Sequence, residues 1–416
     1  MKSENEVVIT GLGIVSPLGN SLPTFWSNCK NGVTGISKFN TFDQLDFKCK
    51  VAATVKEFDY QSSESSFDRH ILFALSATQS AVKDAELVMS EIDPERTGVI
   101  MSTAIAGTAY MEKFFTQTMG SGQVCPEMSP ELHKELLINS LFSTSAAEIA
   151  RQYGARGPVY TVSTGCTGGL DALGAAIDLI KNGECDVVIS GATEAPLTPI
   201  AFAAFDIIGA MTSVDNDCPE KASRPYDKTR SGFVLGEGSG IFILESKKHA
   251  LKRKAKIYAE IVAMASTCNA YHMTNLDSKG EDLARAMTQC LELANVKPEQ
   301  IDYINAHGSS TQQNDVNETN AIKKAFGLHA YNLSVSSLKS IAGHALAAAN
   351  MIESVAAVLS VCNQETTPSM NINHPDPNCD LAYAGNDKMQ INYAMKNASG
   401  FSGIHSAIIL KQYMDC

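Results

Sequence analysis

The sequence predicts an α/β fold, because short apolar strands and helical stretches alternate along most of the chain. With 416 residues, of which 44% are hydrophobic and 19% charged, the chain can bury a sizeable core and is not intrinsically disordered. A strand-like run at residues 7–19 leads into a glycine turn, and further short apolar runs recur at residues 98–102, 159–162, 186–190, 301–305 and 334–337. The helical stretches between them, notably 168–181 and 345–361, predict sheets that are covered on both faces.

The composition excludes several classes of protein. A formal net charge of −12 would repel a phosphate backbone, so we expect no nucleic-acid partner. No run of 18 apolar residues and no signal-peptide order at the N-terminus is visible, which predicts a cytoplasmic protein without a membrane partner. The eleven cysteines show no CxxC pair and no zinc-ligand spacing, so we expect no metal.

Three further features concern the organisation of the chain. We expect a division at residue 250, with residues 1–250 forming an N-terminal half and residues 251–416 a C-terminal half. Residues 233–235 and 241–244, joined by a glycine-rich turn, predict an antiparallel hairpin. Residues 107–144 interrupt the alternation and are rich in Met and Phe, which suits a cover over a pocket, a subunit interface or an ordinary core helix.

Cys166 differs from the other cysteines because it lies in the motif TVSTGCTGGL at residues 161–170. A strand ends there, small residues allow a sharp turn, and a helix begins at once, with Gly183 placed to end it. The N–H groups and dipole at a helix N-terminus favour a thiolate and can stabilise an oxyanion. Three glycines beside Cys166 indicate close approach of another group, so we interpret it as a nucleophile rather than a buried thiol.

Two histidines have matching contexts, in NAHGSST at residues 305–311 and in KSIAGH at residues 339–344. Each follows a strand, and ligand sites collect at the carboxyl ends of strands in α/β proteins. Cys166, His307 and His344 therefore form a candidate catalytic constellation. Paired neutral imidazoles suit the stabilisation of a thioester enolate while a carboxylate leaves as carbon dioxide.

Two other functions compete with this interpretation. A cysteine hydrolase would use a nucleophile elbow, but GCTG at residues 165–168 lacks the first glycine of that motif. A hydrolase would also leave the second histidine without a role. A non-catalytic scaffold subunit would be favoured only if the nucleophile were missing, and Cys166 is present.

Over nearly its full length the sequence resembles the β-ketoacyl synthases of the thiolase superfamily. The motifs that carry the resemblance are VITGLG at 8–13, the Cys166 turn, SRPYD at 223–227, GFVLGEG at 232–238, the two histidine motifs and SGFSG at 399–403. Residues 162–167, CNAYHMT at 268–274 and residues 305–315 look most like the ketosynthase α subunit of type II aromatic polyketide synthases. The β-ketoacyl-acyl carrier protein synthase II type of fatty-acid elongation is the alternative.

The resemblance implies a five-layer α-β-α-β-α fold of two similar halves, with the active site where they meet. It implies that Cys166 carries the growing chain as a thioester and that His307 and His344 assist malonyl decarboxylation. Lys339 and Glu318 match a pair that supports the histidines, although a surface ion pair is the alternative interpretation. Phe401 matches a gating residue whose N–H completes an oxyanion hole with that of Cys166.

The resemblance also implies partners. Type II synthases of this kind work as heterodimers with a chain-length-factor subunit that lacks the cysteine. Their substrates arrive on the phosphopantetheine arm of an acyl carrier protein, and no free cofactor is expected. In this chain Ser402 replaces a family glycine after Phe401, which restricts backbone φ and puts the motion of the gating loop in question.

Overall fold

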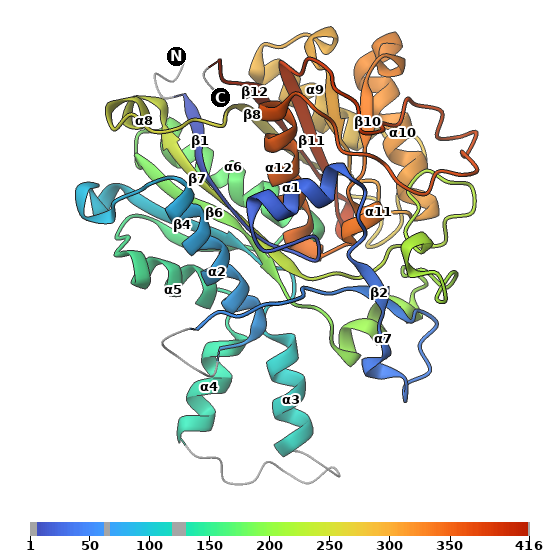
Figure 1. Ribbon diagram of the computed structural model, residues 1–416, viewed down its shortest axis with the longest axis horizontal. Helices are drawn as coiled ribbons and strands as arrows, with labels where there is room; N and C mark the ends of the chain where they lie inside the picture. Colours follow the sequence, from blue (N-terminus) through green and yellow to red (C-terminus); the bar gives the residue numbers. More distant parts are fainter. Residues whose placement is uncertain (1–5, 62–66, 119–129, 415–416) are drawn as a thin grey trace.

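The computed structural model describes residues 6–61, 67–118 and 130–414, which form five layers (Figure 1). Ten strands hydrogen-bond in the order β10-β9-β11-β12-β8-β1-β7-β6-β4-β5. Their bounds are β1 Val7–Val15, β4 Thr97–Ser102, β5 Val159–Val162, β6 Val187–Glu194, β7 Gly238–Ser246, β8 Ala259–Cys268, β9 Tyr303–Asn305, β10 Ser334–Ser336, β11 Tyr393–Ser399 and β12 Ile404–Gln412. A small separate sheet pairs β2 (Ile36–Lys38) with β3 (Val51–Ala53).

The ten strands divide into two groups of five with the same topology. In the N-terminal group β1 is antiparallel to β7, β7 is antiparallel to β6, and β6, β4 and β5 run parallel. In the C-terminal group β8, β12, β11, β9 and β10 repeat those directions in the same order. Only three residue pairs, between β1 and β8, join the groups. The molecule therefore consists of two similar halves, as the thiolase-like fold requires.

Helices cover both faces of each group of strands. One outer layer holds α2 (Arg69–Asp84) and α5 (Thr144–Tyr153), and the other holds α9 (Glu281–Ala294) and α10 (Gln312–Phe326). The middle layer holds α6 (Gly168–Lys181) and α12 (Leu346–Asn363), which contact strands of both halves. The remaining helices are α1 Leu22–Lys30, α3 Thr108–Thr118, α4 Pro130–Ser140, α7 Pro199–Ile207, α8 Lys247–Lys252 and α11 Lys339–Ala342.

The position of α12 in the middle layer explains why its sequence is mostly apolar on every face. A helix packed on every side has no polar face, and residues 346–361 of α12 are all buried. By length and composition this helix could also cross a membrane, with a mean hydropathy of 1.4. Because 89% of that window is buried within the fold, it is the core helix between the two sheets.

The predicted hairpin is wrong. Residues 233–235 form no strand with β7; Phe233 and Leu235 instead make isolated bridges to Met211 and His344. The partners of β7 are β1 and β6, which lie far away in the sequence. The glycines that indicated a tight turn belong largely to β7 itself, where Gly240 packs against the backbone of α12.

The segment 107–144 contains α3 and α4, which project together from the body of the molecule (Figure 1). Residues 119–129 of this segment lie outside the described residues. Phe115, Leu137, Leu141 and Phe142 expose much of their apolar side chains. Phe114 is buried, but the exposure of these four side chains disagrees with the interpretation of the described part as an ordinary core helix.

The predicted boundary at residue 250 falls inside α8, between the last strand of the first half and the first strand of the second. The division into residues 1–250 and 251–416 stays a prediction.

Candidate active site

Cys166 lies in a single 3-10 turn, Gly165–Thr167, between the end of β5 and the start of α6. Gly165 has φ +63°, a left-handed conformation that glycine adopts without strain. Gly168 and Gly169 are explained by the core: a Cβ there would lie 2.2 Å from Ser102 Oγ and 2.3 Å from Asn350 Oδ1. At these two positions the group that approaches closely is therefore part of the protein itself.

The two histidines come from the other half of the molecule. His307 follows β9, and His344 follows α11, a short helix after the neighbouring parallel strand β10. Their rings lie 5.4 Å apart between centroids, nearly perpendicular at 84°. Phe233 packs edge-on against His344 at 5.2 Å. Both side chains are almost fully buried, at 4% and 3% exposure.

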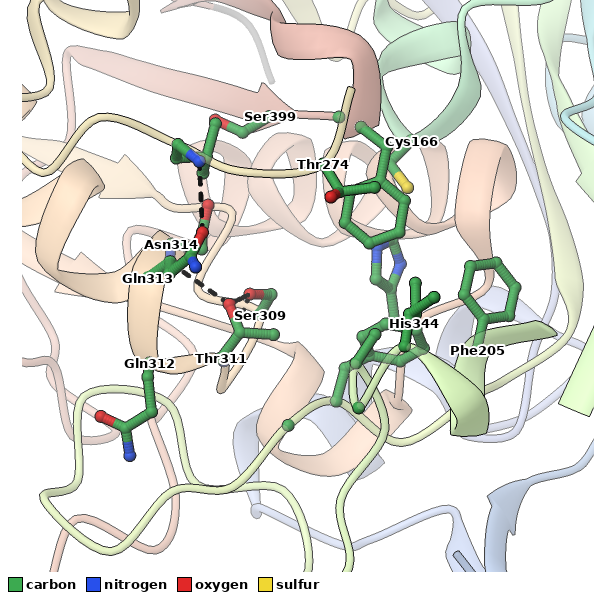
Figure 2. A pocket seen from close by; sticks show the side chains of 18 of the residues that line it. Cys166, Phe205, Thr274, Ser309, Thr311, Gln312, Gln313, Asn314, His344 and Ser399 are labelled. Carbon is green, nitrogen blue, oxygen red and sulfur yellow. Dashed lines mark hydrogen bonds between the residues drawn. The ribbon is translucent and has the colours of Figure 1, made fainter. Parts of the chain in front are cut away.

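Cys166, His307 and His344 line one cavity of about 250 Å³. Figure 2 shows Cys166, His344 and Phe205 on one side of this cavity, and Thr311, Gln312 and Asn314 from the start of α10 on the other. The middle layer brings the halves together, because α12 contacts the Cys166 turn and Asn350 Nδ2 donates to the Cys166 carbonyl. The structure thus places in one site the three residues that the sequence singled out separately.

Burial controls the protonation of these groups. The pKa of His307 and the pKa of His344 are lowered well below the ordinary value, first by burial and then by the positive charge of Lys339. Both imidazoles are therefore neutral at pH 7. Neither Nδ1 atom has a hydrogen-bond partner within the described part of the chain.

Burial also raises the pKa of the Cys166 thiol to about 11. The sequence predicted a shift in the opposite direction, from the dipole of the helix N-terminus. Lys339 and the backbone N–H of Phe401 do lower the pKa of this thiol, but desolvation outweighs both. The resting cysteine is a protonated thiol.

Glu318 and Lys339 are both buried, so the alternative of a surface ion pair is wrong. They do not pair with each other. Glu318 accepts the N–H of His307 at 2.6 Å and that of Gly308 at 2.8 Å. Lys339 Nζ donates to the His307 carbonyl at 2.8 Å and forms its ion pair with Glu353 at 2.5 Å. The backbone of His307 is thus held on both its N–H and its carbonyl.

Glu353 and Lys396 are buried charged residues at this site that the sequence analysis missed. Glu353 lies in the apolar helix α12, and Lys396 lies in the strand β11. A charged residue inside an otherwise apolar buried segment needs a partner of opposite charge, and that signal was available in the sequence. The identity of the partner was not.

Phe401 lies in the 3-10 turn between β11 and β12, and its ring is 37% exposed beside the ring of Phe205. Its backbone N–H faces the Cys166 sulfur closely enough to lower the pKa of that thiol. The next residue, Ser402, has φ +70°, and its N–H donates to the Met273 carbonyl at 2.5 Å. Ser402 therefore keeps the left-handed conformation that a glycine would favour.

Ser402→Gly is expected to stabilise the protein by about 1 kcal/mol, because glycine removes the strain of a left-handed L-residue. The midpoint of urea unfolding measures the change. The matched control is Ser402→Ala, which keeps the strain and should leave the midpoint close to that of the parent. A glycine variant no more stable than the alanine variant would show that this turn stores no strain.

Within the described residues no group of three or more His, Cys, Asp and Glu side chains could hold a metal ion. The polar side chains of the cavity are instead hydroxyls, amides and the two imidazoles, such as Ser309, Thr311 and Gln313. Such a lining suits recognition of an uncharged polar group.

Comparisons with known proteins match the chain over nearly its full length. The N-terminal domain model of β-ketoacyl synthases matches residues 4–250, and the C-terminal domain model matches residues 258–373. A putative polyketide β-ketoacyl synthase 1 of Streptomyces cyaneus is 42% identical over 97% of both chains. A 3-oxoacyl-[acyl-carrier-protein] synthase 2 of Synechocystis is 40% identical over 99% of both.

Among solved structures, a ketosynthase from a type II polyketide synthase complex with its acyl-carrier protein and a hexaketide is similar. It has a TM-score of 0.93 and 42% identity, covering 98% of this chain and 99% of that one. Likeness of this extent places the protein among the condensing acyltransferases with a thiolase-like fold. With both domain models matched in chain order, the chain belongs to the β-ketoacyl synthase family.

Proposed function

We propose that this chain is the ketosynthase α subunit of a type II polyketide synthase. It catalyses the decarboxylative Claisen condensation of malonyl-acyl carrier protein with an acyl or polyketide chain bound to Cys166. The observation that carries the proposal is that Cys166 and two neutral imidazoles line the same cavity. The roles of these residues follow from their chemistry.

In the first half-reaction the Cys166 sulfur attacks the thioester carbonyl of the incoming acyl carrier. The new carbon–sulfur bond forms as the bond to the phosphopantetheine sulfur breaks, and the proton of Cys166 ends on the departing thiol. Because burial raises the pKa of Cys166 to about 11, the thiol keeps this proton at pH 7 until it reacts. The N–H groups of Cys166 and Phe401 serve the oxyanion of the tetrahedral intermediate.

In the second half-reaction a malonyl thioester enters the emptied cavity. Its carboxylate leaves as carbon dioxide, and the electron pair of the broken carbon–carbon bond forms an enolate. His307 and His344 stabilise the enolate oxygen by donating from Nε2, since neutral imidazoles carry one N–H each. The enolate carbon then attacks the Cys166 thioester, which releases the thiolate and extends the chain by two carbons.

The hydrolase alternative is not supported by this site. A Cys-His hydrolase orients its histidine with an acid or amide on Nδ1. Within the described residues neither His307 nor His344 has such a partner. Glu318 and Lys339 both form hydrogen bonds with His307, but they contact its backbone rather than its ring.

The choice between polyketide and fatty-acid synthesis rests on the relatives. Six of the relatives between 38% and 42% identical are polyketide synthases, and 3-oxoacyl-[acyl-carrier-protein] synthases reach 40%. The similar complex structure, at 42% identity, contains a type II polyketide acyl-carrier protein. These facts favour the polyketide function, and fatty-acid elongation is the alternative. Products formed from malonyl-acyl carrier protein decide between them, since a fatty-acid enzyme yields one β-ketoacyl extension and a polyketide enzyme several.

A chain-length-factor subunit is proposed as the partner, together with an acyl carrier protein. A similar solved structure, 29% identical with a TM-score of 0.90, is described as the ishigamide ketosynthase/chain length factor. The surface of this chain offers exposed apolar residues around α4 and on the edge strand β5, namely Leu137, Leu141, Phe142, Val159 and Tyr160. An edge strand with exposed apolar side chains is a site for pairing with another chain.

The chain expressed alone is therefore expected to be poorly soluble or inactive, and a cysteine-less paralogue should restore a stable 1:1 complex. Native mass spectrometry of the co-expressed pair measures the stoichiometry. Tyr160→Glu should weaken the complex, whereas Leu328→Glu, at an exposed apolar residue in the other half, should not. A stable homodimer that elongates acyl chains unaided would favour fatty-acid synthesis. It would leave the roles of Cys166, His307 and His344 unchanged.

A cytoplasmic location and independence from any free cofactor or metal remain predictions of the sequence. The similar ketosynthase structure with its acyl-carrier protein supports a substrate that arrives on a carrier.

A further inference from the structure

Lys396 is a fully buried lysine that neither the motifs nor the mechanism above uses. It lies in β11 opposite Asn305 of β9, the strand that leads to His307. Three acceptors surround its Nζ: Glu353 Oε2 at 2.8 Å, the Asn397 carbonyl at 2.6 Å and the Ala306 carbonyl at 3.4 Å. Burial lowers the pKa of Lys396, and the carboxylate of Glu353 opposes that shift. The three acceptors match the three N–H donors of an ammonium group.

Glu353 connects Lys396 to Lys339. One carboxylate oxygen of Glu353 lies 2.5 Å from Lys339 Nζ and the other lies 2.8 Å from Lys396 Nζ. Lys339 donates to the carbonyl of His307, while Lys396 donates to the carbonyl of the residue before it. The two lysines and one carboxylate therefore hold consecutive carbonyls on the chain that carries the catalytic imidazole.

The charges around this arrangement come from several elements. Glu353 (α12) pairs with both lysines, and Glu318 (α10) holds the His307 N–H. His405 (β12) is buried, and burial lowers its pKa to about 4. Its imidazole is therefore neutral at pH 7. The charge of Lys396 lowers the pKa of both His307 and His344, in the same direction as that of Lys339.

We propose that Lys396 is a second positioning residue of the ketosynthase site. It holds the backbone that precedes His307 and, with Lys339, places two buried positive charges next to the imidazole pair. These charges disfavour a protonated imidazole, so each histidine keeps one N–H donor without acquiring a charge. This inference rests on the proposed function, because it concerns the two histidines as donors to the enolate.

The test uses a Cys166→Gln parent, in which glutamine mimics the acylated cysteine. The rate of carbon dioxide release from malonyl-acyl carrier protein is measured from about pH 4 to about pH 9, together with thermal unfolding at each pH. Lys396→Met removes the charge and the donors, and Lys396→Gln removes the charge but keeps N–H donors for the carbonyls. Lys411→Met, which removes a lysine from β12 that pairs with Glu260 away from the cavity, is the matched control.

We expect the acid limb of the pH–rate profile to move to higher pH by about half a unit or more in both Lys396 variants. The direction follows because loss of a positive charge raises the pKa of nearby imidazoles. The maximal rate should fall by about threefold or more in Lys396→Met and by less in Lys396→Gln, since only the latter can still hold a carbonyl. Lys411→Met should show the parental profile.

Folded Lys396 variants with the parental profile would overturn this inference and leave the proposed function standing. Failure of both variants to fold would also overturn it, because the role of Lys396 would then be structural. A parent that releases no carbon dioxide at any pH would overturn the proposed function and this inference with it.

Discussion

Cys166→Ala is expected to abolish condensation, with a loss of about 10⁴-fold or more, because no other thiol in the cavity can accept the acyl chain. Cys166 is the one cysteine among the residues that line it. Incubation with an acyl-loaded carrier protein, followed by peptide mass spectrometry, should find the acyl group on Cys166 alone. Cys218→Ala, at a partly exposed thiol that does not line the cavity, should retain the parental rate.

The structure changes how this labelling experiment is designed. Cys268 is exposed, whereas the pKa of Cys166 is raised to about 11. A small alkylating reagent at pH 7 therefore labels Cys268 readily, and its reaction with Cys166 should rise about tenfold per pH unit until the thiol ionises. Transfer of the acyl group from the carrier protein depends instead on binding in the cavity that Cys166 lines. Acylation of Cys268 in place of Cys166 by the carrier would reject the assignment of the nucleophile.

His307→Ala and His344→Ala should each lower malonyl decarboxylation by about 10²-fold or more, because each removes one donor to the enolate oxygen. The Cys166→Gln parent isolates this step, since it cannot be acylated. The formation of acetyl-acyl carrier protein, followed by mass spectrometry, measures the rate. His329→Ala is the control, because His329 lies outside the cavity and bonds the Ile301 carbonyl.

Equal rates in both histidine variants and the parent would show that the Cys-His-His scheme is wrong. A lower decarboxylation rate in only one variant would show that only that imidazole stabilises the enolate. The donor function can be tested further with His344→Gln, whose side-chain amide also has N–H donors. It should recover part of the activity that His344→Ala loses.

The alternation of strands and helices in the sequence was sufficient to predict the fold class. The predicted helix at residues 168–181 coincides with α6, and the strand predicted to lead into a glycine turn within residues 7–19 is β1. Such elements are predictable because their periodicity and their end signals are local. The duplicated topology of the two halves is not local, and it became visible only from the strand pairing.

Local patterns failed where distant partners decide the outcome. Gly236, Gly238 and Gly240 indicated a hairpin turn, but Gly238 and Gly240 belong to β7, which pairs with β1 and β6. The glycines after Cys166 indicated the close approach of another group without identifying it, and α12 and Ser102 fill that space. In both cases the glycines correctly indicated a close contact, but the identity of the neighbouring group depended on the whole fold.

By itself the sequence determined the α/β class, the turn that carries Cys166 and the two strand-end contexts of His307 and His344, because each depends on residues adjacent in the chain. Only the tertiary structure decided that Lys339 pairs with Glu353 rather than with Glu318, and that Lys396 completes the group. It also decided the protonation of the site. Burial of Cys166 and the two imidazoles sets the direction of their pKa shifts, since desolvation is a property of the assembled core that no short stretch of sequence contains.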